Sequence, residues 1–375
     1  MARAPIDGNT LQWARHIGRV TRDDLAKSVG VKPERVAEFE AGESSPTFRQ
    51  LTLIATKLDR PLGFFFAPAP AAPDVPEAAD YRGRFHDELP ADLAREMRRA
   101  EQHREAMLDL ETDHGEKLIL RPLDWGNIKE RAADVRQQFG LHDAFVPTES
   151  QTNQVFNFWR GMVEARGILV FQTTKIALET FRGLSIHHGE LPIILINGGD
   201  SASGRTFTLF HELAHLANRT SGLCVLKESI DEEALANGFA ANLLMPESTV
   251  RKILRPIDDP YELSAHLAST FKVSALAAAV RLRSLKVIDE EALAEVWQRS
   301  DAEWRQVREK RKNSDGFVPP WRLRYRDLGS SYIGAVAQAL EDRRVDMMDA
   351  TYLLNARVPM VEQLLSEYYR AGGAE

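Results

Sequence analysis

Apolar residues recur at helical spacing through most of the chain, and polar or capping residues separate the runs. In the N-terminal part, residues 10–66, this pattern predicts five short helices. Thr21 followed by an arginine and two aspartates is typical of a helix N-terminus, and Gly30 of the end of that helix. The next helix has a proline in its first turn and stops at Gly42. Two helices joined by a tight glycine turn predict a helix-turn-helix.

The pattern changes after this unit. Residues 67–80 hold four prolines among alanines, a composition typical of a semi-rigid linker. Residues 90–112 are charged with interspersed apolar positions, which predicts a long surface helix. The short, β-branched-rich runs at 167–172 and 192–197 predict strands of a small sheet.

Helical periodicity returns towards the C-terminus. We expect an amphipathic helix from residue 229 to residue 245 and, at the end of the chain, a helical pair over residues 331–370. Between them the helices are expected at residues 265–271, 274–285 and 290–308, followed by a basic, proline-interrupted stretch at 310–326.

Composition narrows the class of protein. With 375 residues and 43% hydrophobic content, the chain is long enough for two or three domains. It has no apolar run near the roughly 20 residues that cross a bilayer, and no signal-peptide pattern, so we expect a cytoplasmic protein without membrane contacts. Cys224 is its single cysteine, which excludes an intrachain disulfide framework. A net charge of −7 argues against coating nucleic acid everywhere but permits one DNA-binding face.

The candidate chemistry lies in the apolar run at residues 207–217. His211, Glu212 and His215 form an H-E-x-x-H motif there. Histidines at i and i+4 project from one helical face, so both imidazoles can reach one tetrahedral Zn²⁺ with the glutamate beside it. The alternative is that the two histidines lie on a surface helix and bind no metal.

A third ligand is available on the next helix. Glu233 and Asn237 are spaced i and i+4, as expected for a carboxylate ligand and an amide that orients a ligand histidine. Glu232 and Asp231 compete for the ligand role, and the Glu-x-x-x-Asn spacing favours Glu233. Two histidines and one glutamate leave an open zinc position, which is typical of a catalytic site. Glu212 would then act as general base in amide hydrolysis.

Four segments recur in a recognisable order: R-G-L-S at 182–185, P-I-I-L-I-N at 192–197, F-T-L-F-H-E-L-A-H at 207–215 and A-N-G-F-A-A-N-L-L-M-P at 236–246. Together they resemble the ImmA/IrrE-type zinc metallopeptidases fused to an N-terminal Xre-type helix-turn-helix domain. The resemblance implies a zincin-like domain, places the third zinc ligand at Glu233, and implies cleavage of a specific repressor or a role in stress, phage or toxin–antitoxin regulation.

The N-terminal unit resembles the Xre-type DNA-binding module, notably at E-F-E-A-G-E-S-S-P-T, residues 38–47. We expect Lys32 and Arg35 to reach a groove of DNA, with Arg22 or Lys27 on backbone phosphates. Residues 1–62 carry ten Lys and Arg against eight Asp and Glu, a net charge of +2 that is weak for a phosphate-binding surface. A module retained for dimerisation or docking is the alternative.

Three residues near the R-G-L-S segment are candidates for the cleft. His187 and His188 either line it, one of them steadying an oxyanion, or are ordinary turn residues. Arg182 either forms an ion pair near the site or positions substrate.

These features predict a mostly α protein with a small sheet (α+β). We expect a regulatory zinc metallopeptidase whose partners are the operator DNA of its own operon and a protein substrate, and we allow for a homodimer. The alternative is a DNA-binding regulator or antitoxin whose zinc domain senses a signal or docks a cognate toxin without turnover. The expected parts are the helix-turn-helix domain at residues 1–66, the linker at 67–80, the zincin-like domain at 81–286 and a helical C-terminal region at 287–375.

Overall fold

The computed structural model describes residues 3–69, 90–110, 115–142, 144–149, 151–219, 230–312 and 318–371. Its internal contacts divide the chain into two units, Met1–Gln102 and His103–Glu375. Most of the expected linker at 67–80 lies outside the described residues, and the expected domain boundaries stay predictions.

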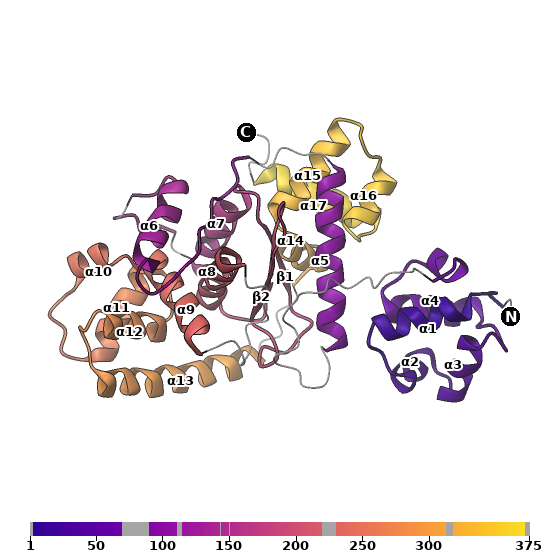
Figure 1. Cartoon of the computed structure of the whole chain (residues 1–375), viewed down its shortest axis with the longest axis horizontal. Helices are drawn as coiled ribbons and strands as arrows, with labels where there is room; N and C mark the ends of the chain where they lie inside the picture. Colours follow the sequence, from indigo (N-terminus) through magenta and orange to yellow (C-terminus); the bar gives the residue numbers. More distant parts are fainter. Residues whose placement is uncertain are drawn as a thin grey trace. The chain divides into compact units, whose positions relative to one another are not determined.

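The first unit contains the predicted helical bundle (Figure 1). Thr21 caps α2 by accepting the Asp24 N–H, and Gly30 ends it in the left-handed conformation, as the sequence predicts. Apolar side chains from every helix, including Leu25, Phe39 and Phe65, form one core. The elements are α1 (Gly8–Ile17), α2 (Arg22–Val29), α3 (Pro33–Glu40), α4 (Phe48–Leu58) and a 3₁₀ helix, η1 (Leu62–Phe66).

A buried carboxylate ties the first three helices together. Glu40, at the end of α3, accepts from Arg15 Nε of α1 at 2.5 Å and from Arg22 Nε of α2 at 2.8 Å. Burial opposes ionisation of Glu40, but these hydrogen bonds and charges outweigh it and hold its pKa below the ordinary value. The charged network therefore depends on Glu40 staying ionised.

The second unit is built on a three-stranded mixed sheet of order β1-β3-β2. The strands are β1 (Leu169–Thr173), β2 (Gly183–Ile186) and β3 (Ile193–Asn197). β1 pairs with β3 in parallel, and β2 pairs with β3 in antiparallel orientation. Every strand residue is buried, so the sheet is covered on both faces.

Two helices pack on the sheet, and two more extend the main core behind them. α8 (Ala202–Asn218) packs against β2, β3, α7 (Thr152–Glu164) and α9 (Ile230–Leu244), and α6 (Ile128–Gln138) packs on α9. Their apolar side chains make one cluster with those of β1 and β3 (Figure 1).

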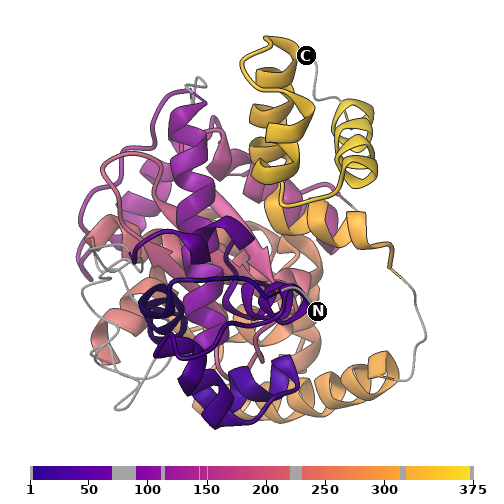
Figure 2. The same ribbon diagram turned by 90° about the vertical axis from the view of Figure 1, so that its right-hand side faces the viewer.

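The remaining helices flank this core (Figures 1 and 2). The 331–370 region is three helices rather than the expected pair, because Asp346 forms a capping box that starts an extra helix and Asn355 breaks the chain after it with a φ of 44°. The helices are α5 (Ala91–Asp109), which contains the unit boundary, α10 (Glu247–Ile253), α11 (Pro260–Phe271), α12 (Ala275–Ser284), α13 (Glu290–Lys312), α14 (Pro320–Leu328), α15 (Ser330–Glu341), α16 (Met347–Leu353) and α17 (Val358–Arg370).

Length and hydropathy identify no membrane-crossing helix among the described residues. Only α11 and α12 taken together are long and apolar enough, and the chain bends by 107° between them.

Replacement of Glu40 by glutamine should loosen α1 to α3. The isosteric amide leaves Arg15 without its buried carboxylate, which costs about 3 kcal/mol. Because the folded pKa of Glu40 is lowered, its contribution is present above the ordinary value of 4.5 and is lost as the pH falls through the folded pKa. Hydrogen exchange of α1 to α3 should therefore be faster in Glu40→Gln at neutral pH, with the difference shrinking in acid. Equal exchange in Glu40→Gln and in the exposed control Glu43→Gln would contradict this role.

Candidate metal centre

α8 places the motif residues inside the protein. Ser201 caps the helix by accepting the Gly204 N–H, and Arg219 ends it in the left-handed conformation. His211, Glu212 and His215 are 6%, 0% and 2% exposed. Burying these polar groups is costly unless each has a partner, so their surroundings decide what the site can do.

The structure brings His211, His215 and Glu233 into one cluster. One ligand atom from each lies within 4.8 Å of the others. The two Nε2 atoms are 3.0 Å apart, and His211 Nε2 lies 3.4 Å from Glu233 Oε2. Tetrahedral zinc with bonds of about 2.0–2.1 Å separates neighbouring ligand atoms by roughly 3.3 Å. The donor set and its spacing therefore fit a zinc ion.

Asn237 fixes which nitrogen of His211 faces the cluster. Its Oδ1 lies 2.9 Å from His211 Nδ1. An amide oxygen only accepts hydrogen bonds, so Nδ1 carries the proton and Nε2 of the neutral ring keeps its lone pair. This is the role expected for Asn237 from its spacing after Glu233. Glu232 and Asp231 lie outside the cluster, in an exposed part of the same helix.

Two buried arginines hold the C-terminal end of α9. Arg136 donates to the Leu243 carbonyl at 2.9 Å. Arg281 donates to the Met245 carbonyl at 3.0 Å and to Asn242 Oδ1 at 2.8 Å. These bonds satisfy C-terminal carbonyls of α9. Neither arginine could be singled out from the sequence, since single basic residues in amphipathic helices are ordinarily solvated.

β2 approaches α8 closely beside Glu212. A Cβ built on Gly183 would lie 2.7 Å from Glu212 Oε1 and 2.4 Å from Thr208 Cγ2. Only glycine permits this approach. The first strand residue of the R-G-L-S segment therefore has a packing role next to the candidate general base, and this strand was not among those predicted.

The expected cleft residues lie around β2 without joining the cluster. Arg182 is 59% exposed and pairs with Asp200 at 3.1 Å, the ion-pair alternative. His187 and His188 follow β2 and are partly buried. Burial, with the nearby charges of Arg219 and His188, lowers the pKa of His187, so its neutral form is favoured. Arg219 ends α8, so the charge that acts on His187 lies at the C-terminal end of that helix.

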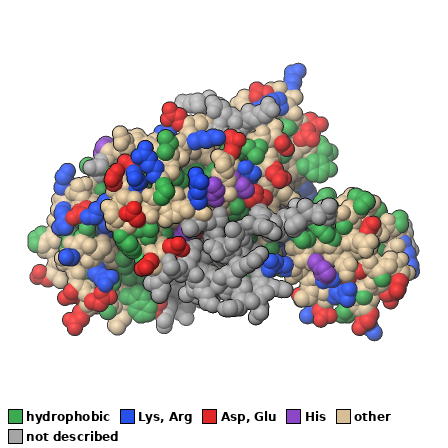
Figure 3. All heavy atoms as spheres, in the orientation of Figure 1, with side chains coloured by type: hydrophobic (Ala, Val, Ile, Leu, Met, Phe, Trp, Pro, Cys, Tyr) green, Lys and Arg blue, Asp and Glu red, His purple; other side chains and the backbone are tan. Residues whose placement is uncertain are grey.

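The residues expected to bind DNA differ in exposure and in whether they form ion pairs within the protein. Lys27 and Lys32 are exposed. Arg22 pairs with Glu40, and Arg35 pairs with Glu38 and lies 5.4 Å from the centre of the Phe39 ring. On the face shown in Figure 3, acidic and basic side chains are interspersed rather than gathered into one field.

Family comparisons support both parts of the chain. Residues 19–65 match the helix-turn-helix family, and residues 163–283 match the IrrE N-terminal-like domain, a metallopeptidase family. The predicted combination of an Xre-type domain with an ImmA/IrrE-type domain is confirmed. The second match spans the sheet, α8, α9 and the helices to α12.

Other comparisons add little. No curated protein matches the chain. Among solved structures, PlcR from Bacillus thuringiensis in complex with a peptide and DNA is 12% identical, with 98% of this chain and 95% of that chain covered and a TM-score of 0.16. ComR from Streptococcus suis is 14% identical, with 99% and 97% covered and a TM-score of 0.16.

Metal content tests the cluster directly. Purified protein should bind about one zinc per chain, and His211→Ala, His215→Ala and Glu233→Gln should each lose most of it, because each removes one of three ligands. Asn237→Ala keeps the ligands but frees the His211 ring, so zinc affinity should fall about 10- to 100-fold. Elemental analysis and competition with a chelating dye measure both.

Glu232→Gln is the matched control, since it neutralises the neighbouring carboxylate on the same helix. Zinc retained in Glu233→Gln and lost in Glu232→Gln would show that the ligand assignment is wrong.

Proposed function

We propose that this chain is a regulatory zinc-dependent metallopeptidase of the cytoplasm, which binds DNA and hydrolyses a peptide bond in a specific partner protein such as a repressor. The observation that carries the proposal is the cluster of His211, His215 and Glu233, with Asn237 orienting a ligand and Glu212 on the same helix. The match of residues 163–283 to a metallopeptidase family supports it.

Each residue has a separable chemical task. His211, His215 and Glu233 would hold zinc, which when bound supplies Lewis acidity towards a carbonyl and lowers the pKa of water. Glu212 would take a proton from the attacking water and deliver it to the leaving amine. Its burial strengthens the electrostatic effect of its charge, and Gly183 leaves room for its carboxylate beside β2.

One observation favours a second candidate function. Glu212 is fully buried in this conformation, so a substrate must gain access before it can act as a base. A DNA-binding regulator or antitoxin, whose zinc domain senses a signal or docks a toxin without turnover, needs no such access. The two candidates differ in whether the Glu212 proton matters.

Glu212→Gln separates these functions. The amide is nearly isosteric and lies outside the ligand cluster, so zinc binding and folding should survive. Cleavage of the partner should fall at least about 100-fold, because the general base is lost. The measurement incubates the protein with a repressor encoded beside it and follows fragments by mass spectrometry.

Thr206→Val, on the same helix but outside the cluster, is a control for helix integrity, since its hydroxyl donates to the Ala202 carbonyl rather than to any cluster residue. Cleavage that proceeds equally in wild type and Glu212→Gln sinks the mechanism. Regulation in cells that is unaffected by Glu212→Gln, with no cleavage by wild type, favours the regulator without turnover.

DNA binding should depend on the start of α3. Lys32 is exposed at its N-terminus and Arg35 lies one turn later, so removing both charges takes away two contacts to DNA. We expect Lys32→Ala/Arg35→Ala to weaken binding to the promoter of its own operon and to reduce the steepness with which added salt weakens that binding. A gel-shift titration at two salt concentrations measures both effects.

Lys252→Ala/Arg255→Ala is a charge-matched control, since both residues are exposed in the second unit. Binding by wild type that ignores DNA sequence, or that responds equally to both double variants, would leave the first unit as a dimerisation or docking module.

A further inference from the structure

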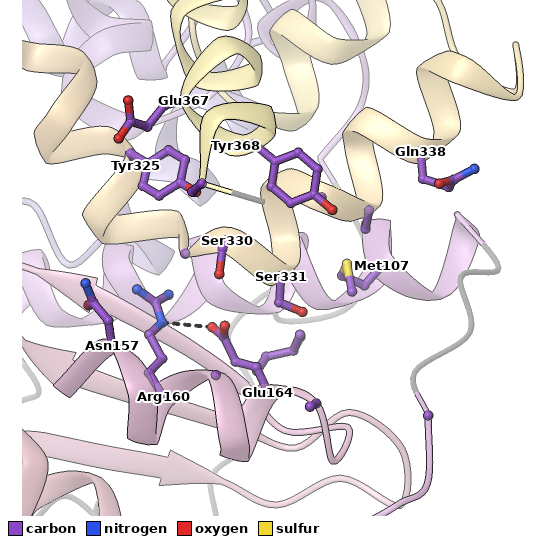
Figure 4. Close-up of a pocket in the computed structure, with 18 of the residues that line it drawn as sticks. Met107, Asn157, Arg160, Glu164, Tyr325, Ser330, Ser331, Gln338, Glu367 and Tyr368 are labelled. Atoms are coloured by element: carbon purple, nitrogen blue, oxygen red, sulfur yellow. Dashed lines mark hydrogen bonds and ion pairs between the residues drawn. The ribbon is translucent and has the colours of Figure 1, made fainter. Parts of the chain in front are cut away.

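A cavity of about 1430 Å³ lies in the second unit, away from the metal cluster. α7 and β1 form one side, and α14, α15 and α17 form the other. In Figure 4, Arg160 and Glu164 lie on one side, Tyr325 and Tyr368 on the opposite side, and the first residues of α15 between them. Sites for small molecules usually measure about 300–1,000 Å³, so this cavity has room for a metabolite with its hydration water.

The carboxylates that line the cavity all have a partner of opposite charge, but the arginines do not. Its three carboxylates are each bound by an arginine: Glu164 by Arg160 at 2.8 Å, Asp342 by Arg344 at 3.1 Å, and Glu367 by Arg370.

Of the four lining arginines, Arg160 and Arg344 belong to those pairs, and Arg326 is bound by Asp327 at 2.6 Å. Arg322 is the one lining arginine for which the described residues supply no carboxylate. Its guanidinium lies 5.2 Å from the centre of the Trp321 ring. The lining thus offers a positive charge that the protein does not itself neutralise.

Hydroxyl groups complete a donor-rich surface. Ser330 and Ser331 at the start of α15, Tyr325 on α14 and Tyr368 on α17 line the cavity. Within the described part of the chain, no hydrogen bond engages these four hydroxyls. Burial raises the pKa of both tyrosines, so their hydroxyls stay protonated and can donate. Such groups suit a ligand rich in acceptor oxygens.

The Arg160–Glu164 pair builds the wall opposite the tyrosines. Arg160 Nη1 donates to the Arg326 carbonyl at 2.7 Å, at the end of α14, and Arg160 Nε donates to Glu164 Oε1 at 2.8 Å. Gly329 makes the turn between these helices with a φ of 85°, and a Cβ there would lie 2.0 Å from Arg160 Nη2. Burial raises the pKa of Glu164, and its ion pair with Arg160 opposes that shift.

We propose that this cavity binds a small organic anion, a carboxylate or phosphate ester, whose charge pairs with Arg322 and whose oxygens accept from the hydroxyls of α14, α15 and α17. Binding in this cavity can be measured whether or not the proposed peptidase activity is present.

The cavity is connected to α8, the helix that carries His211 and His215, through α7. Arg160 and Glu164 lie on α7, and on the same helix Trp159 packs edge-on against Phe210 of α8, with ring centres 5.1 Å apart. Phe210 immediately precedes His211. A ligand that fixes α14 and α15 against α7 would therefore act one helix away from His211. Under this proposal the ligand is an effector of the cluster on α8 and not a substrate.

Isothermal titration of the full chain with succinate and with glucose 6-phosphate tests the site and distinguishes the two anion sources. At least one probe should bind saturably, while sodium chloride at equal ionic strength should not displace it. Arg322→Gln should weaken binding about tenfold, the effect of losing one charged hydrogen-bond partner. Hydrogen exchange should slow in α7, α14 and α15 on binding.

Arg255→Gln is the control, an equal loss of charge at an exposed residue outside the cavity. Arg322 is itself exposed, so its replacement should leave the melting temperature unchanged, and Tyr368→Phe gives a second, milder loss of affinity. The proposal is overturned if neither probe binds saturably, if Arg322→Gln and Arg255→Gln bind equally well, or if salt alone abolishes the signal.

Discussion

The second unit is organised by the cost of burying two imidazoles and a carboxylate on α8. A helix enclosed by β2, β3, α7 and α9 would ordinarily be apolar throughout, because uncompensated polar groups inside a protein destabilise it. Here α9 supplies Asn237 and Glu233, and β2 supplies a glycine where a larger residue would collide with Glu212. The positions of α9 and β2 are therefore matched to the chemistry on α8, and the arginines at the end of α9 keep that match in place.

Sequence patterns predicted the parts of this arrangement that depend on local periodicity. The spacing of His211 and His215 puts both rings on one face of a helix whatever surrounds it, and Thr21 and Gly30 bound α2 through contacts within a few residues. β2 escaped prediction because four residues are too short for alternation to show, and its identity as a strand comes from pairing with β3. The role of Glu40 could not be predicted, since nothing local in the sequence reveals that Arg15 and Arg22 converge on it.

The contacts of the basic residues in the first unit limit how they can be used. Arg22 and Arg35 are each committed to a glutamate of α3, so contacts to phosphate must compete with those pairs. Lys27 and Lys32 are exposed. A module of net charge +2 gains little from long-range attraction to DNA, so specific groove contacts would contribute more to its affinity than phosphate neutralisation.

One helix, α7, lines the cavity and also packs against α8, which carries His211 and His215. α7 bears Arg160 and Glu164 on the side of the C-terminal helices, while Trp159 on the same helix reaches Phe210 in the main core. Arg160 donates to Glu164, the Arg326 carbonyl and the Val170 carbonyl, so one side chain joins the end of α14 to α7 and β1. A ligand that shifts the junction of α14 and α15 would therefore act first on Arg160, and through α7 on the Trp159–Phe210 contact beside His211. Because packed cores switch between discrete arrangements rather than deform continuously, such a shift would favour one arrangement of α7 against α8 over another.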